Sequence, residues 1–192
     1  MLRLIAILVF LSGTLAFGQD PAHDQTKHAE EHSSGHEEHS AFRPHRLALV
    51  SGYGFLSGAI NEDGEKKSHI VPVFGVDYEY WFNHKIGVGT HNDLEMGVYS
   101  VELDHQEYIE RNFAVVTSLV FLYEPVHNWA LFAGPGYELE KHHNFPVFKV
   151  GTDISKSFEG GWGIGVVLAY DFKEVNSAIT LGFTVSKRLG KH

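Results

Sequence analysis

From residue 46 onward, apolar and polar positions alternate along the chain with the period of two that is typical of a β-strand with two different faces. In the segment 69–82, for example, Ile70 and Phe74 share one face, whereas Gly75 and Asp77 share the other. The alternation predicts eight strands, at residues 46–57, 69–82, 85–102, 108–123, 129–141, 145–158, 162–173 and 177–189. Eight strands with short connections predict an all-β, antiparallel, up-and-down barrel.

The direction in which the apolar face points separates two kinds of barrel. An eight-stranded barrel has an interior only just wide enough for its own side chains or one small ligand. Each predicted strand carries several large apolar residues on one face, many of them aromatic, and these cannot all fit inside. We therefore expect the apolar face to contact lipid and the polar face to fill the lumen. A soluble barrel of the lipocalin type, with the faces reversed, is the alternative.

Three tryptophans, Trp81, Trp129 and Trp162, each flank a short predicted connection on the same side of the barrel. Together with Phe82, Tyr123 and Phe158, these tryptophans predict an aromatic girdle at one membrane interface. Chance placement of aromatics beside turns is the alternative interpretation.

The strand pattern over 46–190, with its closing segment AITLGFTVSKRLG, resembles the small bacterial outer-membrane β-barrels, such as the OmpA transmembrane domain and the OmpX- and OmpW-like proteins. This resemblance implies a transmembrane β-barrel in the bacterial outer membrane, surrounded by outer-membrane lipid. Many barrels of this kind end on an aromatic residue, and this chain carries Leu189 near its end instead.

Residues 1–18 have the pattern of a signal peptide: a basic start, an apolar run, and the small residues Ala16 and Gly18 at positions −3 and −1 of a cleavage site. We expect the mature chain to begin at Gln19, in an exported protein. An uncleaved anchor is the alternative.

Residues 19–45 form a histidine-rich segment that we predict to be a disordered tail in the periplasm. Its six acidic and two basic residues surround very little apolar surface, too little to offset the entropy lost on ordering. Imidazole and carboxylate groups suit Zn²⁺ or Cu²⁺, so the segment predicts weak, multivalent metal binding. The candidate ligands are His23, His28, His32, His36 and His39. A solvated linker that binds no metal is the alternative.

Composition excludes several classes of function. A net charge of −9 disfavours nucleic acid as a partner, because binding to phosphates requires a basic surface. The absence of cysteine excludes disulfides, thiolate zinc sites and cysteine nucleophiles.

The predicted lumen face is rich in charge. Its acidic members are Asp77, Glu79, Asp93, Glu95, Glu110, Glu138, Glu140, Asp153 and Asp171, and its basic members are Lys85, Lys149, Lys173 and Arg188, with His91. In a narrow barrel we expect these groups to pair with one another, because an unpaired buried charge is costly. A cation path or metal site at His91, Asp93 and Asp77 is the alternative.

No family signature of a catalytic nucleophile surrounds Ser100, Ser118 or Ser177. The sequence therefore predicts a non-enzymatic outer-membrane barrel with a structural, permeability or envelope-interaction role. A metal-linked barrel that uses the histidine-rich tail, and a lipid-modifying barrel enzyme, are the alternatives. The pattern identifies no protein partner.

Overall fold

The computed structural model describes residues 42–60, 66–103, 107–140, 144–174 and 176–190. These residues contain eight strands: β1 (His45–Ile60), β2 (Lys66–Trp81), β3 (Ile86–Leu103), β4 (Glu107–Val126), β5 (Trp129–Leu139), β6 (Phe145–Ser157), β7 (Trp162–Lys173) and β8 (Ala178–Leu189). One turn of 3-10 helix, η1 (Glu159–Gly161), joins β6 to β7. The eight predicted strands are confirmed, with ends that differ by a few residues. The predicted signal peptide and most of the predicted tail lie outside the described residues.

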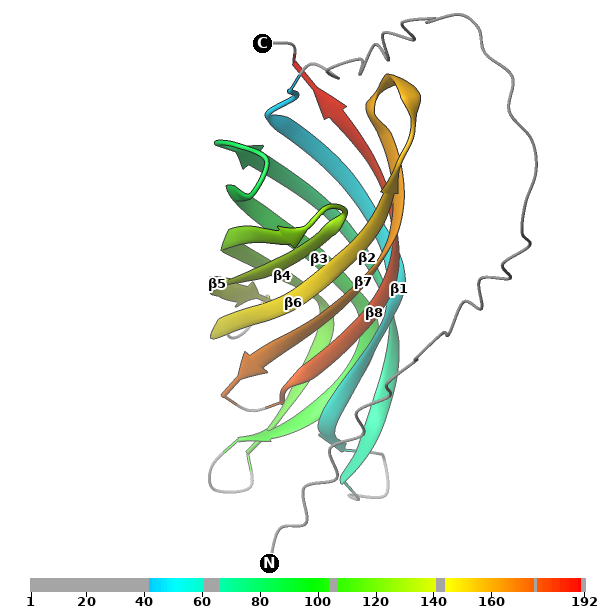
Figure 1. The fold of residues 1–192 in the computed structure, drawn as a ribbon. Helices are drawn as coiled ribbons and strands as arrows, with labels where there is room; N and C mark the ends of the chain where they lie inside the picture. The colour runs from blue at the N-terminus through cyan, green and yellow to red at the C-terminus, as the bar shows by residue number, and fades with distance from the viewer. Residues whose placement is uncertain (1–41, 61–65, 104–106, 141–143, 175, 191–192) are drawn as a thin grey trace, which may run out of the picture. The chain divides into compact units, whose positions relative to one another are not determined.

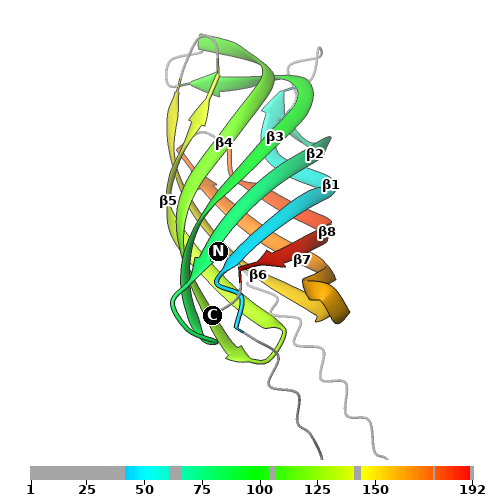
Figure 2. The same ribbon diagram turned by 90° about the horizontal axis from the view of Figure 1, so that it is seen from above.

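The strands pair in sequence order and close into a barrel, as Figures 1 and 2 show. Closure comes from β1, which pairs antiparallel with both β2 and β8, so that Leu49 lies opposite Val76 on one side and Val185 on the other. The predicted all-β, antiparallel, up-and-down barrel is confirmed. Because the sheet closes on itself, each of the eight strands has a hydrogen-bonded neighbour strand on both sides.

The two ends of the barrel differ in their connections. At one end, which we call the turn end, lie the short connections 82–85, 127–128 and 158–161, together with the start of β1 and the end of β8. The opposite end, which we call the loop end, carries the connections β1–β2, β3–β4, β5–β6 and β7–β8. In Figure 1 the turn end is at the top. Both ends of the described chain therefore lie at the turn end.

Large apolar side chains cover the outside of the barrel. Among them Leu49 is 62% exposed, Leu119 is 61% exposed and Phe183 is 73% exposed, all within strands. The neighbouring residues in each strand point inward and are mostly buried. The predicted orientation, with the apolar face outside, is confirmed. Within the described residues, no helix has the length and apolar character needed to cross a membrane.

The polar residue Asn92 lies on the mostly apolar outer face of β3, and residues of both neighbouring strands satisfy it. The side chain of Asn92 donates a hydrogen bond to the carbonyl oxygen of Val76 at 2.9 Å, and its own oxygen accepts one from the Thr117 hydroxyl at 2.8 Å. Because both ends of the amide have partners, Asn92 can lie on an apolar surface without an unsatisfied polar group.

The alternation of β4 breaks at Asn112 and Phe113, which are both exposed and lie between the buried residues Arg111 and Ala114. Phe113 has a φ of 53°, and the register of β4 against β3 shifts near the same place. Between the pairs Glu95–Ala114 and Val98–Asn112, two residues of β3 lie opposite Phe113 alone, which is the pattern of a β-bulge, and β4 changes face at this point. The bulge allows Arg111 to point into the barrel.

Candidate functional site

The interior of the barrel is the candidate functional site, because the charges of the strands converge there. Buried charged side chains come from seven of the eight strands, β1 to β7. The described members are Arg46, Asp77, Glu79, His91, Asp93, Glu95, Arg111, Glu124, Glu138, Lys149, Asp153, Asp171 and Lys173. They form three groups along the axis of the barrel.

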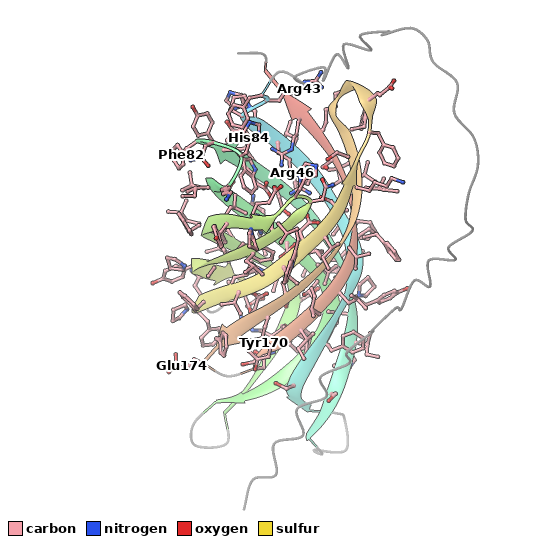
Figure 3. The ribbon with its side chains drawn as sticks, in the orientation of Figure 1. Arg43, Arg46, Phe82, His84, Tyr170 and Glu174 are labelled. Atoms are coloured by element: carbon pink, nitrogen blue, oxygen red, sulfur yellow. The ribbon has the colours of Figure 1, made fainter. Side chains whose placement is uncertain are left out.

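The group nearest the turn end is built around Arg46 of β1. Its guanidinium donates to Glu79 at 2.7 Å and to Asp153 at 2.6 Å, so that it links β1 to β2 and to β6 across the lumen. The indole N–H of Trp81 donates to the other oxygen of Glu79 at 2.8 Å. Arg188 lies over the Trp81 ring, 5.2 Å from its centre. Figure 3 shows Arg46 inside the barrel near this end.

The middle group is built around Lys149 of β6, which is 1% exposed. Its ammonium lies 2.9 Å from Asp93 Oδ2 on β3 and 2.8 Å from Asp171 Oδ1 on β7. One cation therefore bridges two carboxylates that belong to strands on different sides of the lumen. This geometry compensates both buried carboxylates with one buried ammonium.

The group nearest the loop end is built around Lys173 and Arg111. Lys173 lies 2.6 Å from both Glu95 and Glu138, and Arg111 lies 2.6 Å from the other oxygen of Glu138. The guanidinium of Arg111 also lies over the Phe145 ring, 4.4 Å from its centre. The carboxylates and cations of this group form a continuous chain of ion pairs from β3 to β4.

Apolar side chains fill the space that the ion pairs leave. One buried cluster consists of Val50, Trp81, Val120, Leu122, Ala130, Phe132, Val167 and Ala169. A second consists of Leu56, Val71, Val73, Tyr99 and Ala178. The prediction that the polar face fills the lumen is wrong in one respect, because the large apolar side chains of Trp81 and Phe132 also point inward. The cavity beside His91 and Lys149 measures about 10 Å³, roughly the room that one water needs.

Trp81 corrects the predicted aromatic girdle. It follows the inward-facing residues Asp77 and Glu79 at intervals of two, and it is 1% exposed, so it belongs to the interior. The remaining predicted members do lie on the outside at the turn end: Phe82, Tyr123, Trp129, Phe158 and Trp162. Adjacency to a turn suggested the girdle for Trp81, but strand alternation decides the face.

The predicted trio His91, Asp93 and Asp77 lies inside the barrel on two neighbouring strands. Asp77 is opposite His91 in the register, as the prediction required. However, the Nε2 atom of His91 lies 3.5 Å from Glu79, and Asp93 pairs with Lys149. Among the described residues, no group of three or more histidine and acidic side chains could hold a metal ion. The tail candidates His23, His28, His32, His36 and His39 lie outside the described residues.

The register also places Asp77, His91 and Ser118 side by side on β2, β3 and β4. An acid, a histidine and a serine are the residue types of a hydrolase triad, but a triad needs the hydroxyl hydrogen-bonded to the imidazole. The hydroxyl of Ser118 has no hydrogen-bond partner among the described residues, and it is buried against Gly136 of β5. This row of residues therefore packs the interior without the contacts of an activated nucleophile.

The sequence pattern did not lead us to predict two of the interior cations, Arg46 and Arg111. Arg46 shares the inward face of β1 with Ala48 and Val50, so the alternation could have identified it. Arg111 could not be found in that way. Counted back from Ala114, strict alternation would place it outside, and only the bulge at Phe113 brings it in. Of the predicted lumen residues, Lys85 is instead exposed on the β2–β3 turn. The side chain of Glu110, another predicted lumen residue, is not among those that the structure describes.

The chain matches no protein-family model and none of the curated proteins. Among solved structures it is similar to Ail, the attachment invasion locus protein of Yersinia pestis, with 12% identity and a TM-score of 0.48, over 77% of this chain and 100% of that one. It is also similar to Neisserial surface protein A, with 9% identity and a TM-score of 0.49, over 76% of this chain and 97% of that one. A third similar structure is that of the outer membrane protein OprG from Pseudomonas aeruginosa, with 11% identity and a TM-score of 0.48, over 78% of this chain and 99% of that one.

The predicted resemblance to small outer-membrane barrels is confirmed as a similarity to solved structures of such proteins. Identities and TM-scores of this size establish neither a family nor a function for this chain. The fold is established by the closed strand order of the chain itself.

Proposed function

We propose that this chain is a non-enzymatic β-barrel of the bacterial outer membrane, with a structural or interaction role in the envelope and no open pore. The observation that carries the proposal is the contrast between the two faces of the wall. Large apolar side chains cover the outside, whereas paired charges and apolar clusters fill the inside. Both faces are energetically favourable only when lipid surrounds the outside of the barrel.

Water is the wrong solvent for the outer face. Leu49, Phe74, Leu119, Phe172 and Phe183 are each about half exposed or more, and they belong to different strands around the barrel. Soluble monomers rarely expose a continuous apolar surface of this kind. In a bilayer the same surface contacts hydrocarbon, and the closed sheet satisfies its backbone hydrogen bonds internally.

The interior supports a sealed barrel. In each of the three groups a cation bridges carboxylates from separate strands, which connects opposite walls of the lumen. The cavity beside His91 has a volume of only about 10 Å³, roughly the room that one water needs, which supports a closed lumen at that height. A permeability role would require these ion pairs to separate.

We further propose that the turn end lies in the periplasm. Short periplasmic turns are typical of transmembrane barrels. Phe82, Tyr123, Trp129, Phe158 and Trp162 would then mark the periplasmic interface, and the segment that precedes β1 would extend into the periplasm.

Membrane fractionation and planar bilayers test the main proposal together. We expect the mature protein to fractionate with the outer membrane and to require detergent for extraction. In planar bilayers, the purified protein should give no stable conductance above background. Recovery as a compact species without detergent would refute the membrane assignment, and large stable conductance steps would refute the sealed interior.

The composition of the tail supports a second proposed function, metal capture in the periplasm, since five histidines lie between residues 23 and 39 among acidic residues. Calorimetric titration of the mature protein with Zn²⁺, beside a variant that lacks residues 19–41, tests it. Binding that disappears with the deletion supports the proposal. If the mature protein binds no Zn²⁺ at concentrations up to roughly millimolar, the proposal is refuted.

A further inference from the structure

We propose that a patch of cationic and aromatic side chains at the turn end binds the phosphate headgroups of anionic phospholipids in the adjoining leaflet. The patch, called here the turn-end patch, consists of Arg43, Lys156, Phe158, Trp162 and Lys187. The proposal rests on the proposed function, because it requires the barrel to span a membrane.

The strands bring the patch together around the β6–β7 turn. Trp162 begins β7 and lies opposite Lys187 of β8. The backbone N–H of Phe158 donates to the carbonyl oxygen of Trp162 at 2.8 Å, which closes the turn and places the two aromatic residues beside each other. Lys156 precedes Phe158 by two residues on the same outward face of β6. The two lysines therefore flank the aromatic pair from the strands on either side of β7.

Both lysines lie against the aromatic rings. The ammonium of Lys187 lies 4.5 Å from the centre of the Trp162 ring and donates a hydrogen bond to the carbonyl oxygen of Gly160 at 2.9 Å. The ammonium of Lys156 lies 5.9 Å from the centre of the Phe158 ring. Contacts of this kind hold the cations at the height of the aromatic residues, where a lipid headgroup meets the hydrocarbon.

Arg43 supplies a third cation to the same turn. Its guanidinium lies so close to Gly161 that a Cβ atom on Gly161 would collide with it. Gly161 has a φ of 85°, so the turn needs glycine for its backbone as well as for this contact. Figure 3 shows Arg43 at the turn end, beside the β6–β7 hairpin. Three cations from separate parts of the chain thus surround one turn.

The charge of this surface is opposite to that of the chain. The full chain has a net charge of −9. On the outer surface of the turn end, the described charged side chains other than histidine are Arg43, Lys85, Lys156, Lys187 and Glu159. Arg43, Lys156 and Lys187 have no carboxylate partner among the described residues. An ammonium has three donors, and Lys187 uses one on Gly160, so donors remain for a phosphate.

This chemistry selects a negatively charged headgroup. Phosphatidylglycerol has a net negative charge and phosphate oxygens that accept hydrogen bonds, whereas phosphatidylcholine is neutral overall. Each basic residue near an anionic lipid surface favours association by roughly fivefold. We therefore expect the turn-end patch to enrich phosphatidylglycerol around Trp162.

Quenching by brominated lipids measures this enrichment directly. The full mature chain carrying Trp81→Phe and Trp129→Phe retains Trp162 as its only tryptophan. It is reconstituted in phosphatidylcholine bilayers that contain the same fraction of brominated phosphatidylglycerol or brominated phosphatidylcholine. We expect stronger quenching by the anionic lipid, and a relative affinity that falls about fivefold with Lys187→Gln and further with Lys156→Gln added. Lys187→Arg should retain the preference, and so should Lys85→Gln, which removes a cation from the β2–β3 turn.

The outcomes separate the two proposals. Equal quenching by both lipids, in protein that both lipids quench, overturns the lipid site and leaves the membrane assignment intact. Quenching by neither lipid contradicts the membrane assignment itself. Raised salt provides a test without substitution, because it should reduce the preference of the parent protein. A preference that appears only after deletion of residues 19–41 would show that the acidic tail occupies the patch, which also overturns the proposal.

Discussion

Lys149 is the residue whose removal tests the ion-paired interior most sharply. Replacing it by methionine keeps most of the side-chain volume and removes the charge that bridges Asp93 and Asp171. Both carboxylates are buried, and no other cation lies within ion-pairing distance of Asp93 among the described residues. The substitution therefore leaves two buried negative charges facing each other across the lumen.

The expected loss follows from this geometry. Breaking a buried ion pair by removing one partner costs about 3–5 kcal/mol, since the remaining charge is left uncompensated. That loss corresponds to a decrease of roughly a hundredfold to several thousandfold in the folding equilibrium constant. Adding Asp93→Asn and Asp171→Asn to Lys149→Met removes the stranded charges, so the triple variant should regain a large part of the loss.

Urea unfolding in lipid vesicles, followed by tryptophan fluorescence, measures these free energies. Lys85→Met is the matched control, because Lys85 is exposed on the β2–β3 turn and its loss should change the free energy of unfolding by less than about 0.5 kcal/mol. If Lys149→Met costs no more than Lys85→Met, or if the triple variant is as unstable as the single one, the ion pairs do not hold the interior as described.

Two further substitutions test the wall of the barrel in the same unfolding assay. Thr117→Val removes the donor to Asn92 and should cost about 1–3 kcal/mol, whereas Thr117→Val with Asn92→Leu should recover that loss; an unchanged loss in the double variant would contradict the pairing. Gly134→Ala should cost about 1–3 kcal/mol, because a Cβ atom there would collide with the carbonyl oxygen of Leu119 on β4, and wild-type stability would show that the strands are not so close.

The sequence predicts the barrel well because its main signal is local. Alternation with a period of two assigns each residue to a face without knowledge of its neighbours, and the exposed Phe74 beside the buried Val73 follows that rule. Strand ends are less well predicted, because turns and bulges depend on pairing with the adjacent strand. β4, for example, continues to Val126, beyond its predicted end.

The site is less predictable because its pairs join distant strands. Arg46 and Asp153 are 107 residues apart in the chain, and only closure of the barrel with its register brings them together. The bulge at Phe113 has no clear signature in the sequence, so the inward position of Arg111 could not be derived. Trp81 shows the opposite case. Its face follows from alternation, but its position beside a turn suggested the membrane interface.

The central claim, that the apolar outer face meets lipid, can be measured directly because the chain contains no cysteine. Single cysteines replacing Phe74, Leu119 and Phe183 would carry spin labels, with Glu159→Cys on the β6–β7 turn as the control, in the mature protein reconstituted in vesicles. We predict that the three strand labels collide readily with dissolved oxygen but not with an aqueous nickel complex, whereas the turn label shows the reverse. Labels at the three strand positions that the nickel complex reaches freely, or that neither reagent reaches, would contradict the account.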